Sequence, residues 1–376
     1  MGSAAIEDLV RTGKYGLDLG IGDLDLERAK VLANSFPNTS QTYKVNVTDV
    51  DKLASILKGY DAVVNATWYE NNLDVMRACV KAGCNYNDLG GLFHTTRKQI
   101  LLDTEMKASG ISAVVGGGES PGITNVMCFL AAEEMSRVES VKIYAGAKET
   151  GSSDNLVFPF SVSTVIDEYT KKPVEYLEGS YREVPPLSGD EEIEFPEPIG
   201  KKLCHYSIHS EPATLPASIG KGVTNVEFRL GISEKLVSTL APLIELGMLS
   251  EGRTIPVGGQ LISPRDFVVS FFNAKSQGEG EIERCVGLKV VVTGMSDDGK
   301  KSKVTCDLIC QPGSYGIKNA TAYLTGVAGS IFGQYLANDK VPKGVIAPEL
   351  AVDSKEFARE LESRDIKIAK RIDFID

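Results

Sequence analysis

Two residues near the start of the chain have the types and spacing of a dinucleotide-binding motif. Gly2 directly precedes an apolar helical run, and Asp23 follows 21 positions later, at the end of the short apolar strand 17–21. In a G-x-G-x-x-G turn the last glycine opens the helix that binds pyrophosphate, and an acidic residue about 20 positions on binds the ribose hydroxyls. A carboxylate there repels a 2′-phosphate, so Asp23 predicts NAD, with NADP as the second choice. Asp25 is a neighbouring candidate, but its position is typical of a helix N-cap.

The strand and the first two glycines of such a motif would precede Met1. We therefore expect either that the natural protein begins about a dozen residues upstream or that this form binds the cofactor poorly. The alternative interpretation is that Met-Gly-Ser is a cloning remnant and the 21-residue spacing is accidental.

Further candidates for cofactor contacts follow the later strands, because parallel sheets bind ligands beyond the carboxyl ends of their strands. Each could instead be an ordinary β-to-α turn, but together they favour a cofactor site. Asp49 is placed on the adenine side. The candidates are Asp49, Ala66, Thr67, Asp88, Gly90 and Gly118.

Two further residues have the chemistry of a general acid or base. His94 follows Gly90-Gly91, where a nicotinamide would lie, and Glu119 precedes Ser120-Pro121 at the mouth of a glycine run. Imidazole titrates near neutrality, and a carboxylate can orient an amine or a water. The competing interpretations are a polar loop histidine and a solvent-facing turn carboxylate.

The segment KLCHYSIHSE places His205 and His209 on one face of a predicted strand, 203–208. Four residues of strand span about 13 Å, which is too far for both rings to bind one metal ion. We therefore predict no metal site and interpret both histidines as substrate contacts, with an exposed polar face as the alternative. Tyr169 in IDEYT is a weaker substrate candidate, because packing could also explain it.

The elements that would position these residues change in character along the chain. Residues 1–122 alternate helix and strand signals, which predicts parallel βαβ units and a doubly wound Rossmann sheet lacking its first strand. Residues 123–312 contain longer alternating strands, which favour a mostly antiparallel sheet in a second domain. These strands include 141–145, 203–208, 223–230, 267–272, 288–293 and 303–310. Residues 184–200 are acidic and proline-rich, which predicts an exposed loop or sheet edge. Residues 313–376 contain predicted helices at 320–337 and 354–364.

Composition narrows the classes of partner. The net charge is −11, which argues against nucleic acid or an anionic membrane as a partner. No apolar run reaches the length of a membrane span. The 7 scattered cysteines are typical of reduced, buried thiols, so we expect a cytoplasmic protein, with Cys306 and Cys310 in a core.

The run DAVVNATWYENNLDVMRACVKAGCNYNDLGG and then GGGESPGITNV resemble the saccharopine dehydrogenase family, including its L-lysine dehydrogenases. The similarity continues in STVIDEYTKKPVEYLEG, in VEFRLG and in TAYLTGVAGSIFGQYLANDKVPKGVIAPE, so it covers nearly the whole chain. Three features depart from the family pattern: the absent start of the phosphate loop, the acidic Asp23 and the divergent segment LGGLFHTTRKQ.

The resemblance implies a Rossmann domain, then a substrate and dimerisation domain with a mixed sheet, and C-terminal helices that return to the first domain. It implies a homodimer, and it makes Arg229 in VEFRLG a substrate-carboxylate ligand, with a surface salt bridge as the alternative. It also implies hydride transfer at a carbon that bears an amine. We therefore predict an NAD-dependent oxidoreductase acting on the C–N bond of an amino acid such as saccharopine or lysine, in lysine metabolism. The alternatives are a carboxynorspermidine-type reductase and a non-catalytic dinucleotide-binding protein.

Overall fold

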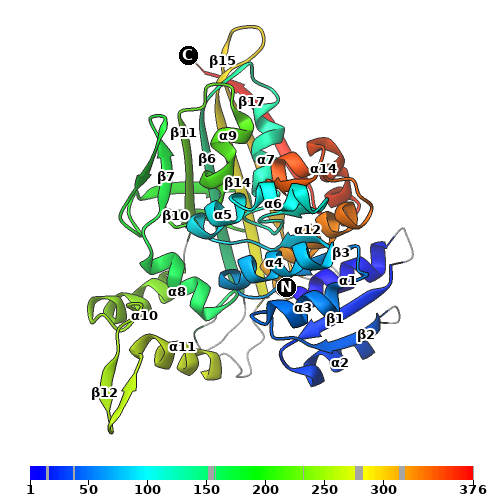
Figure 1. Cartoon of the computed structure of the whole chain (residues 1–376). Helices are drawn as coiled ribbons and strands as arrows, with labels where there is room; N and C mark the ends of the chain where they lie inside the picture. Colours follow the sequence, from blue (N-terminus) through cyan, green and yellow to red (C-terminus); the bar gives the residue numbers. More distant parts are fainter. Residues whose placement is uncertain are drawn as a thin grey trace.

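Figure 1 shows the computed structural model of the chain, with the helices and strands of the N-terminal part in blue and cyan. The structure describes residues 1–13, 17–36, 39–150, 156, 158–231, 233–275, 283–312 and 318–375. No helix in these ranges is both long enough and apolar enough to cross a membrane.

The N-terminal part alternates helices and parallel strands, as the sequence predicts. Its elements are α1 (Gly2–Thr12), β1 (Leu19–Asp23), α2 (Leu26–Asn34), β2 (Thr39–Lys44), α3 (Val50–Leu57), β3 (Ala62–Asn65), η1 (Tyr69–Asn71), α4 (Asn72–Ala82), β4 (Asn85–Asp88), α5 (Phe93–Ile100), α6 (Asp103–Ala108) and β5 (Ser112–Val114). The expected N-cap is confirmed, because the Asp25 side chain accepts a hydrogen bond from the Glu27 amide.

The parallel strands form two sheets: β1 pairs with β2, and a second sheet has the order β16-β5-β4-β3. A doubly wound sheet has the strand order 3-2-1-4-5-6. The pair β1-β2 and the sheet that contains β3, β4 and β5 correspond to the strands that lie on the two sides of strand 1 in that order. Helix α1 packs against α12 (Ala320–Ala337). The contact is close at Gly326, where an added Cβ atom would lie 2.6 Å from atoms of Ala4 and Ala5.

The second part is built on a mixed sheet of order β17-β15-β14-β6-β11-β10-β9, in which β7 pairs with β11 and β8. Its strands are β6 (Arg137–Thr150), β7 (Val174–Leu177), β8 (Ser180–Glu183), β9 (Glu191–Phe195), β10 (Gly200–Tyr206), β11 (Asn225–Gly231), β14 (Glu283–Met295), β15 (Lys301–Cys310) and β17 (Ile368–Phe374). The expected antiparallel character holds except between β6 and β11, which are parallel. The exposed loop or edge expected at 184–200 contains β9, which pairs with β10 and ends the strand order, so the expectation of a sheet edge is confirmed.

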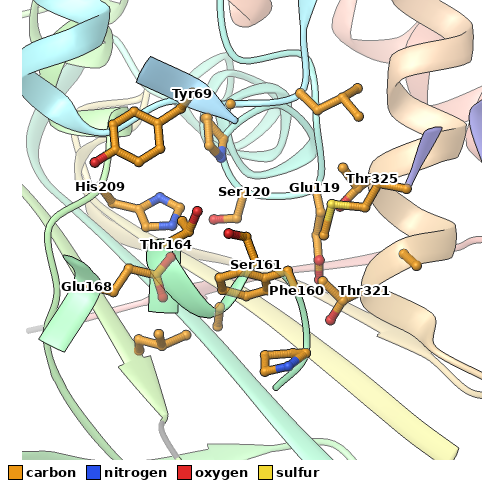
Figure 2. Close-up of a pocket in the computed structure, with 18 of the residues that line it drawn as sticks. Tyr69, Glu119, Ser120, Phe160, Ser161, Thr164, Glu168, His209, Thr321 and Thr325 are labelled. Carbon is orange, nitrogen blue, oxygen red and sulfur yellow. The ribbon is translucent and has the colours of Figure 1, made fainter. Parts of the chain in front are cut away.

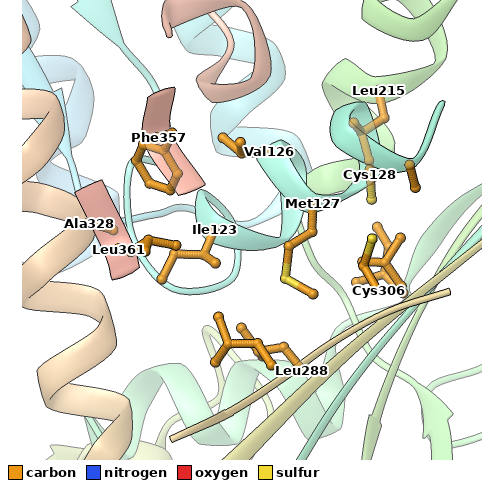
Figure 3. Packing of buried hydrophobic residues seen from close by; sticks show 14 of the residues in the cluster. Ile123, Val126, Met127, Cys128, Leu215, Leu288, Cys306, Ala328, Phe357 and Leu361 are labelled. Atoms are coloured by element: carbon orange, nitrogen blue, oxygen red, sulfur yellow. The ribbon is translucent and has the colours of Figure 1, made fainter. Parts of the chain in front are cut away.

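Helices α7 (Ile123–Ala132) and α9 (Glu211–Ile219) pack on the mixed sheet, and α12, α13 (Pro348–Ala351) and α14 (Ser354–Glu362) complete the core. Figure 3 shows Met127 and Cys128 of α7 facing Leu288 and Cys306 of the sheet. Cys306 and Cys310 are both buried and unpaired, as predicted. The C-terminal segment joins the two parts, because β16 (Gly344–Ile346) pairs with β5 while β17 pairs with β15.

A small helical unit projects from the second part, on the left of Figure 1. It contains α8 (Val162–Thr170), α10 (Glu234–Glu245), the hairpin of β12 (Ile255–Val257) and β13 (Gln260–Ile262), and α11 (Pro264–Lys275). The strand predicted at 267–272 is wrong, because this segment lies in α11. Val268 and Phe272 are buried while Phe267 and Phe271 are exposed, which is the four-residue spacing of a helix face rather than strand alternation.

Candidate active site

A cavity of about 570 Å³ lies between the two parts. One wall consists of the N-terminus of α1 and the loops after β3 and β4, and the other consists of α8, the segment before α9, and β14. Figure 2 shows Glu119, Thr321 and Thr325 on one side of this space and Tyr69, His209 and Glu168 on the other. The cavity therefore places the carboxyl ends of parallel strands opposite side chains of the second part.

Four of the predicted cofactor residues line the cavity: Gly2, Ala66, Thr67 and Gly90. The Asn65 side chain holds the turn at Thr67 by accepting from its amide at 3.1 Å and its hydroxyl at 2.7 Å. Gly90 has φ +134°, and a Cβ atom on it would lie 3.0 Å from Pro121. These glycine and alanine positions leave open backbone, so this wall fits the pyridine nucleotide that the strand topology implies.

Asp88 does not line the cavity, but it bonds to Gly90, which does. Its buried carboxylate accepts from the amides of Gly90 and Gly116, both at 2.9 Å, and from the side chains of Gln99 and Tyr86. These bonds use the carboxylate within the protein, so Asp88 shapes the turns at Gly90 and Gly116. Gly118 does not line the cavity; a Cβ atom on it would lie 2.2 Å from the Leu89 carbonyl oxygen.

Asp23 and Asp49 also lie outside the cavity lining. Asp23 ends β1, and its side chain accepts from the Asp25 amide at 2.9 Å. Asp49 caps α3 by accepting from the Lys52 amide at 3.2 Å. The position of Asp23 at a carboxyl strand end keeps it a candidate for ribose binding, whereas a cap role is what the structure shows for Asp49.

His209 and Glu211 form a buried pair at the floor of the cavity. Nδ1 of His209 lies 2.5 Å from Oε2 of Glu211, and its ring stacks on Phe228 with centroids 3.8 Å apart. Burial alone would lower the pKa of His209, but the carboxylates of Glu211, Glu168 and Glu119 outweigh it and raise that pKa.

Burial would likewise raise the pKa of Glu211, but His209 and the hydroxyls of Ser120 and Thr124 lower it. Ser120 and Thr124 donate to Oε1 of Glu211 at 2.6 and 2.7 Å. The pair is therefore an imidazolium held against a carboxylate, with the ring at the cavity surface.

Glu119 and Glu168 are two further buried carboxyl groups that line the cavity. Burial raises the pKa of each to about 8, against the opposing effects of Arg284 and His209. Both groups are therefore protonated near neutrality, and each can release or accept a proton there. Shifted carboxyl groups of this kind are a recurrent property of sites that carry out acid–base chemistry.

Arg284 is the only lysine or arginine side chain among the described residues that line the cavity. Its Nη1 donates to Glu149 at 2.7 Å and its Nε to Thr321 at 3.2 Å, which fixes the guanidinium at the cavity edge. A guanidinium held in this way suits a carboxylate group of a ligand.

The other predicted residues lie elsewhere. His94 is exposed on α5, and its ring contacts Phe93. His205 lies on β10, where its Nδ1 is 3.0 Å from Asp190. The shared strand face expected for His205 and His209 is wrong, because β10 ends at Tyr206. Tyr169 is buried in the core of the helical unit.

Arg229 is a buried residue of β11 in the mixed sheet and does not line the cavity. Its Nε donates to the Gly189 carbonyl and its Nη2 to Tyr206 and Glu227 at 2.7 to 2.9 Å, while Nη1 lies 3.4 Å from Glu191, so the guanidinium is held among groups of the protein. It is thus an internal ion pair rather than the surface one that was the alternative.

Glu168, Glu211 and Arg284 are the site residues that sequence reasoning missed. Glu211 follows His209 by two positions in HSE, and Glu168 directly precedes Tyr169, so both lie within segments already singled out. Arg284 has no local signal, because it is brought to the cavity by the pairing of β14 with β6.

Comparisons with known proteins agree with this architecture. Residues 1–114 match the saccharopine dehydrogenase NADP-binding domain, and residues 118–366 match the saccharopine dehydrogenase C-terminal domain. An apo saccharopine dehydrogenase (L-Glu forming) from Saccharomyces cerevisiae has the same fold, with a TM-score of 0.76 at 16% identity over 99% of this chain and 98% of that chain.

Two curated relatives are more similar in sequence than that structure, but the similarity covers less of each chain. The carboxyaminopropylagmatine dehydrogenase of Synechocystis sp. is 25% identical over 84% of this chain and 80% of its own length. The carboxynorspermidine synthase of Vibrio alginolyticus is 23% identical over 58% of this chain and 55% of its own length. Because family models match both parts of the chain in order, the protein belongs to the saccharopine dehydrogenase family and is a pyridine-nucleotide-dependent oxidoreductase.

Proposed function

We propose that the protein oxidises or forms the C–N bond of a carboxylate-bearing amine, using NAD in preference to NADP. The observation that carries this proposal is the cavity itself. In one space of about 570 Å³ it combines open turns after parallel strands with three buried proton-holding groups and a fixed guanidinium.

The bound nicotinamide would supply the hydride acceptor or donor. Gly2 at the N-terminus of α1, with Ala66, Thr67 and Gly90, would hold it. Asp23, at the end of β1, would contact the ribose and disfavour a 2′-phosphate. The family model is named for NADP, so this preference is a specific property that we propose for this chain.

The protein groups account for the protons. In the oxidative direction a hydride, with its two electrons, leaves the carbon bonded to nitrogen, and a protonated imine forms on the substrate. Water then adds to that carbon, and cleavage of the C–N bond yields a carbonyl compound and an amine. Both protons of the water leave it as the carbonyl forms, and the nitrogen takes up two protons to depart as an ammonium group. His209, Glu119 and Glu168 are the groups that would exchange these protons.

The polar groups of the cavity favour a substrate that has both a carboxylate and an amine. Arg284 would bind the carboxylate, and the carboxyl groups of Glu119 and Glu168 would provide hydrogen-bond partners for the amine. Saccharopine and lysine have this pattern. The names of the two curated relatives support a second candidate, a carboxylated polyamine adduct. A homodimer and a cytoplasmic location remain proposals that rest on family resemblance and on composition.

A substrate panel tests the proposal. Saccharopine, lysine, carboxynorspermidine and carboxyaminopropylagmatine would each be incubated with NAD and with NADP, and reduced nicotinamide would be followed by absorbance. We expect turnover with one adduct and a loss of turnover in the His209→Asn variant, whereas His205→Asn serves as the matched control. If no substrate is turned over in either direction and neither nucleotide binds, the protein is a non-catalytic member of the family.

A further inference from the structure

The carboxylate of Asp167 lies at the centre of a polar cluster beside the cavity. Its side chain has no exposed surface, and it accepts from the Tyr69 hydroxyl at 2.6 Å and from Arg265 at 2.5 Å. The ammonium group of Lys171 lies 3.7 Å from it and also donates to Tyr69 at 3.1 Å.

The cluster joins two regions that are distant in sequence. Tyr69 belongs to η1, in the segment matched by the NADP-binding family model, whereas Asp167 belongs to α8 and Arg265 to α11 of the helical unit. Lys171 extends the connection, with Glu251 at 2.9 Å and Glu70 at 3.9 Å from its ammonium group. Glu70, Asp167 and Glu251 resemble a set of metal ligands, but the Lys171 ammonium interacts with all three carboxylates.

Both ends of the connection contribute to the cavity. Tyr69 lines it directly, and Glu168, the residue after Asp167, lines it from α8 together with Thr164. Consecutive residues of a helix point in directions about 100° apart. Fixing Asp167 on one side of α8 therefore fixes the direction in which Glu168 enters the cavity.

We propose that Asp167 is a positioning residue that clamps α8 to η1 and thereby holds Glu168 opposite the nicotinamide wall. The proposal rests on the proposed function, because it takes the cavity as the active site. A buried carboxylate that is bonded to a cation and to a hydroxyl from another segment is costly to form unless all partners are in place. Relative movement of the two regions would leave Asp167 or Arg265 without its partner.

Tyr69→Phe is the sharpest test, because it keeps the ring in the cavity wall and removes only the hydroxyl shared by Asp167 and Lys171. Tyr181→Phe is the control, since Tyr181 also packs against aromatic rings but lies outside the cavity lining. We expect kcat to fall about 10- to 100-fold in Tyr69→Phe, as for a misplacement of about 1 Å, with the nucleotide Kd within about twofold of the parent value. Unchanged kcat in a folded Tyr69→Phe variant would overturn the proposal.

Asp167→Asn adds a signature that a merely structural role would not give. Glu168 is surrounded by His209, Asp167, Arg284 and Glu211, and the Asp167 charge raises its pKa. Removing that charge should shift the limb of the kcat–pH profile that belongs to Glu168 to lower pH. If the folded variant loses only thermal stability and keeps the parent profile, Asp167 has no positioning role.

Trp68, the only tryptophan of the chain, provides a readout that needs no substrate. It lines the cavity and its ring lies 5.6 Å from that of Tyr69. We expect Tyr69→Phe and Asp167→Asn to shift its emission to longer wavelength and Tyr181→Phe to leave it unchanged. If the parent protein turns over no substrate while these shifts occur, the clamp stands and the proposed function fails. If turnover is normal and emission and kcat are insensitive to both variants, the clamp fails alone.

Discussion

Two buried clusters of this protein contain the same kinds of side chain but differ in what their polar atoms face. Around Arg229, the guanidinium stacks 4.1 Å above the Tyr206 ring and binds Glu227, and the cluster closes on itself. Around His209, the carboxyl groups of Glu119 and Glu168 have no hydrogen bond to any described side chain, and they face a cavity. Burial of charge without a protein partner is what shifts pKa values toward neutrality. The comparison indicates that charge and burial alone do not mark a candidate site, and that polar groups facing a cavity do.

The largest effect should come from replacing the acid–base group of the open cluster. His209→Asn should reduce kcat about 10² to 10⁴-fold, because that is the usual contribution of a positioned acid or base. Steady-state kinetics against His205→Asn would check it, since His205 interacts with Asp190 outside the cavity. Equal activity of the two variants would remove His209 from the chemistry.

The next largest effect should distinguish Arg284, which lines the cavity, from Arg229, which does not. Arg284→Gln should raise KM for a carboxylate substrate by an amount corresponding to about 1.5–3 kcal/mol, the range for a hydrogen bond to a charged group. Arg229→Gln should instead leave Glu227 without its cation and lower the melting temperature, with kcat/KM of the folded protein unchanged. A KM effect at Arg229 and none at Arg284 would reverse our assignment.

A smaller effect is expected for cofactor choice. Asp23→Ala should reduce the preference for NAD over NADP by about tenfold, which corresponds to about 1.4 kcal/mol. Asp25→Ala is the matched control, because it removes a helix cap and should lower thermal stability without changing the preference. Nucleotide titrations followed by Trp68 emission would measure both, and an unchanged ratio in Asp23→Ala would exclude this carboxylate from the ribose site.

The smallest effect is the pH dependence of stability in the open cluster. Folding raises the pKa of Glu119 from 4.5 to about 8, so its stabilising contribution is complete below pH 4.5 and is lost as pH rises through 8. Glu119→Gln should therefore flatten the decline of the melting temperature across this range. The flattening is partial, because Glu168 and His209 have raised pKa values and contribute in the same direction.

The exposed Glu192, which pairs with Lys201 at 2.9 Å, provides the control through Glu192→Gln. Calorimetry from pH 5 to 9 would compare the variants. A parallel decline in Glu119→Gln and the parent protein would show that this carboxyl group does not titrate as proposed.

Much of the fold is encoded locally. The alternation of helices and strands up to β5, the cap at Asp25 and the core position of Cys306 follow from periodicity and residue type. The segment 267–272 was misassigned from sequence because its valines and phenylalanines favour strands in isolation, and packing of Val268 and Phe272 in the helical unit decides otherwise.

The sequence by itself indicated the family, the cavity wall with Gly2, Ala66, Thr67 and Gly90, Glu119 as an acid–base candidate and His209 as a substrate contact. It also assigned His94 an acid–base role at a position that the structure leaves outside the cavity. Only the tertiary structure decided which charged groups share the cavity. Glu168 and Arg284 reach it from α8 and β14, whereas Arg229 lies outside the cavity lining and binds Tyr206 on β10 and Glu227 on β11. The physical reason is that residue type sets what a side chain can do, whereas long-range strand pairing and helix packing set which polar atoms remain free to do it.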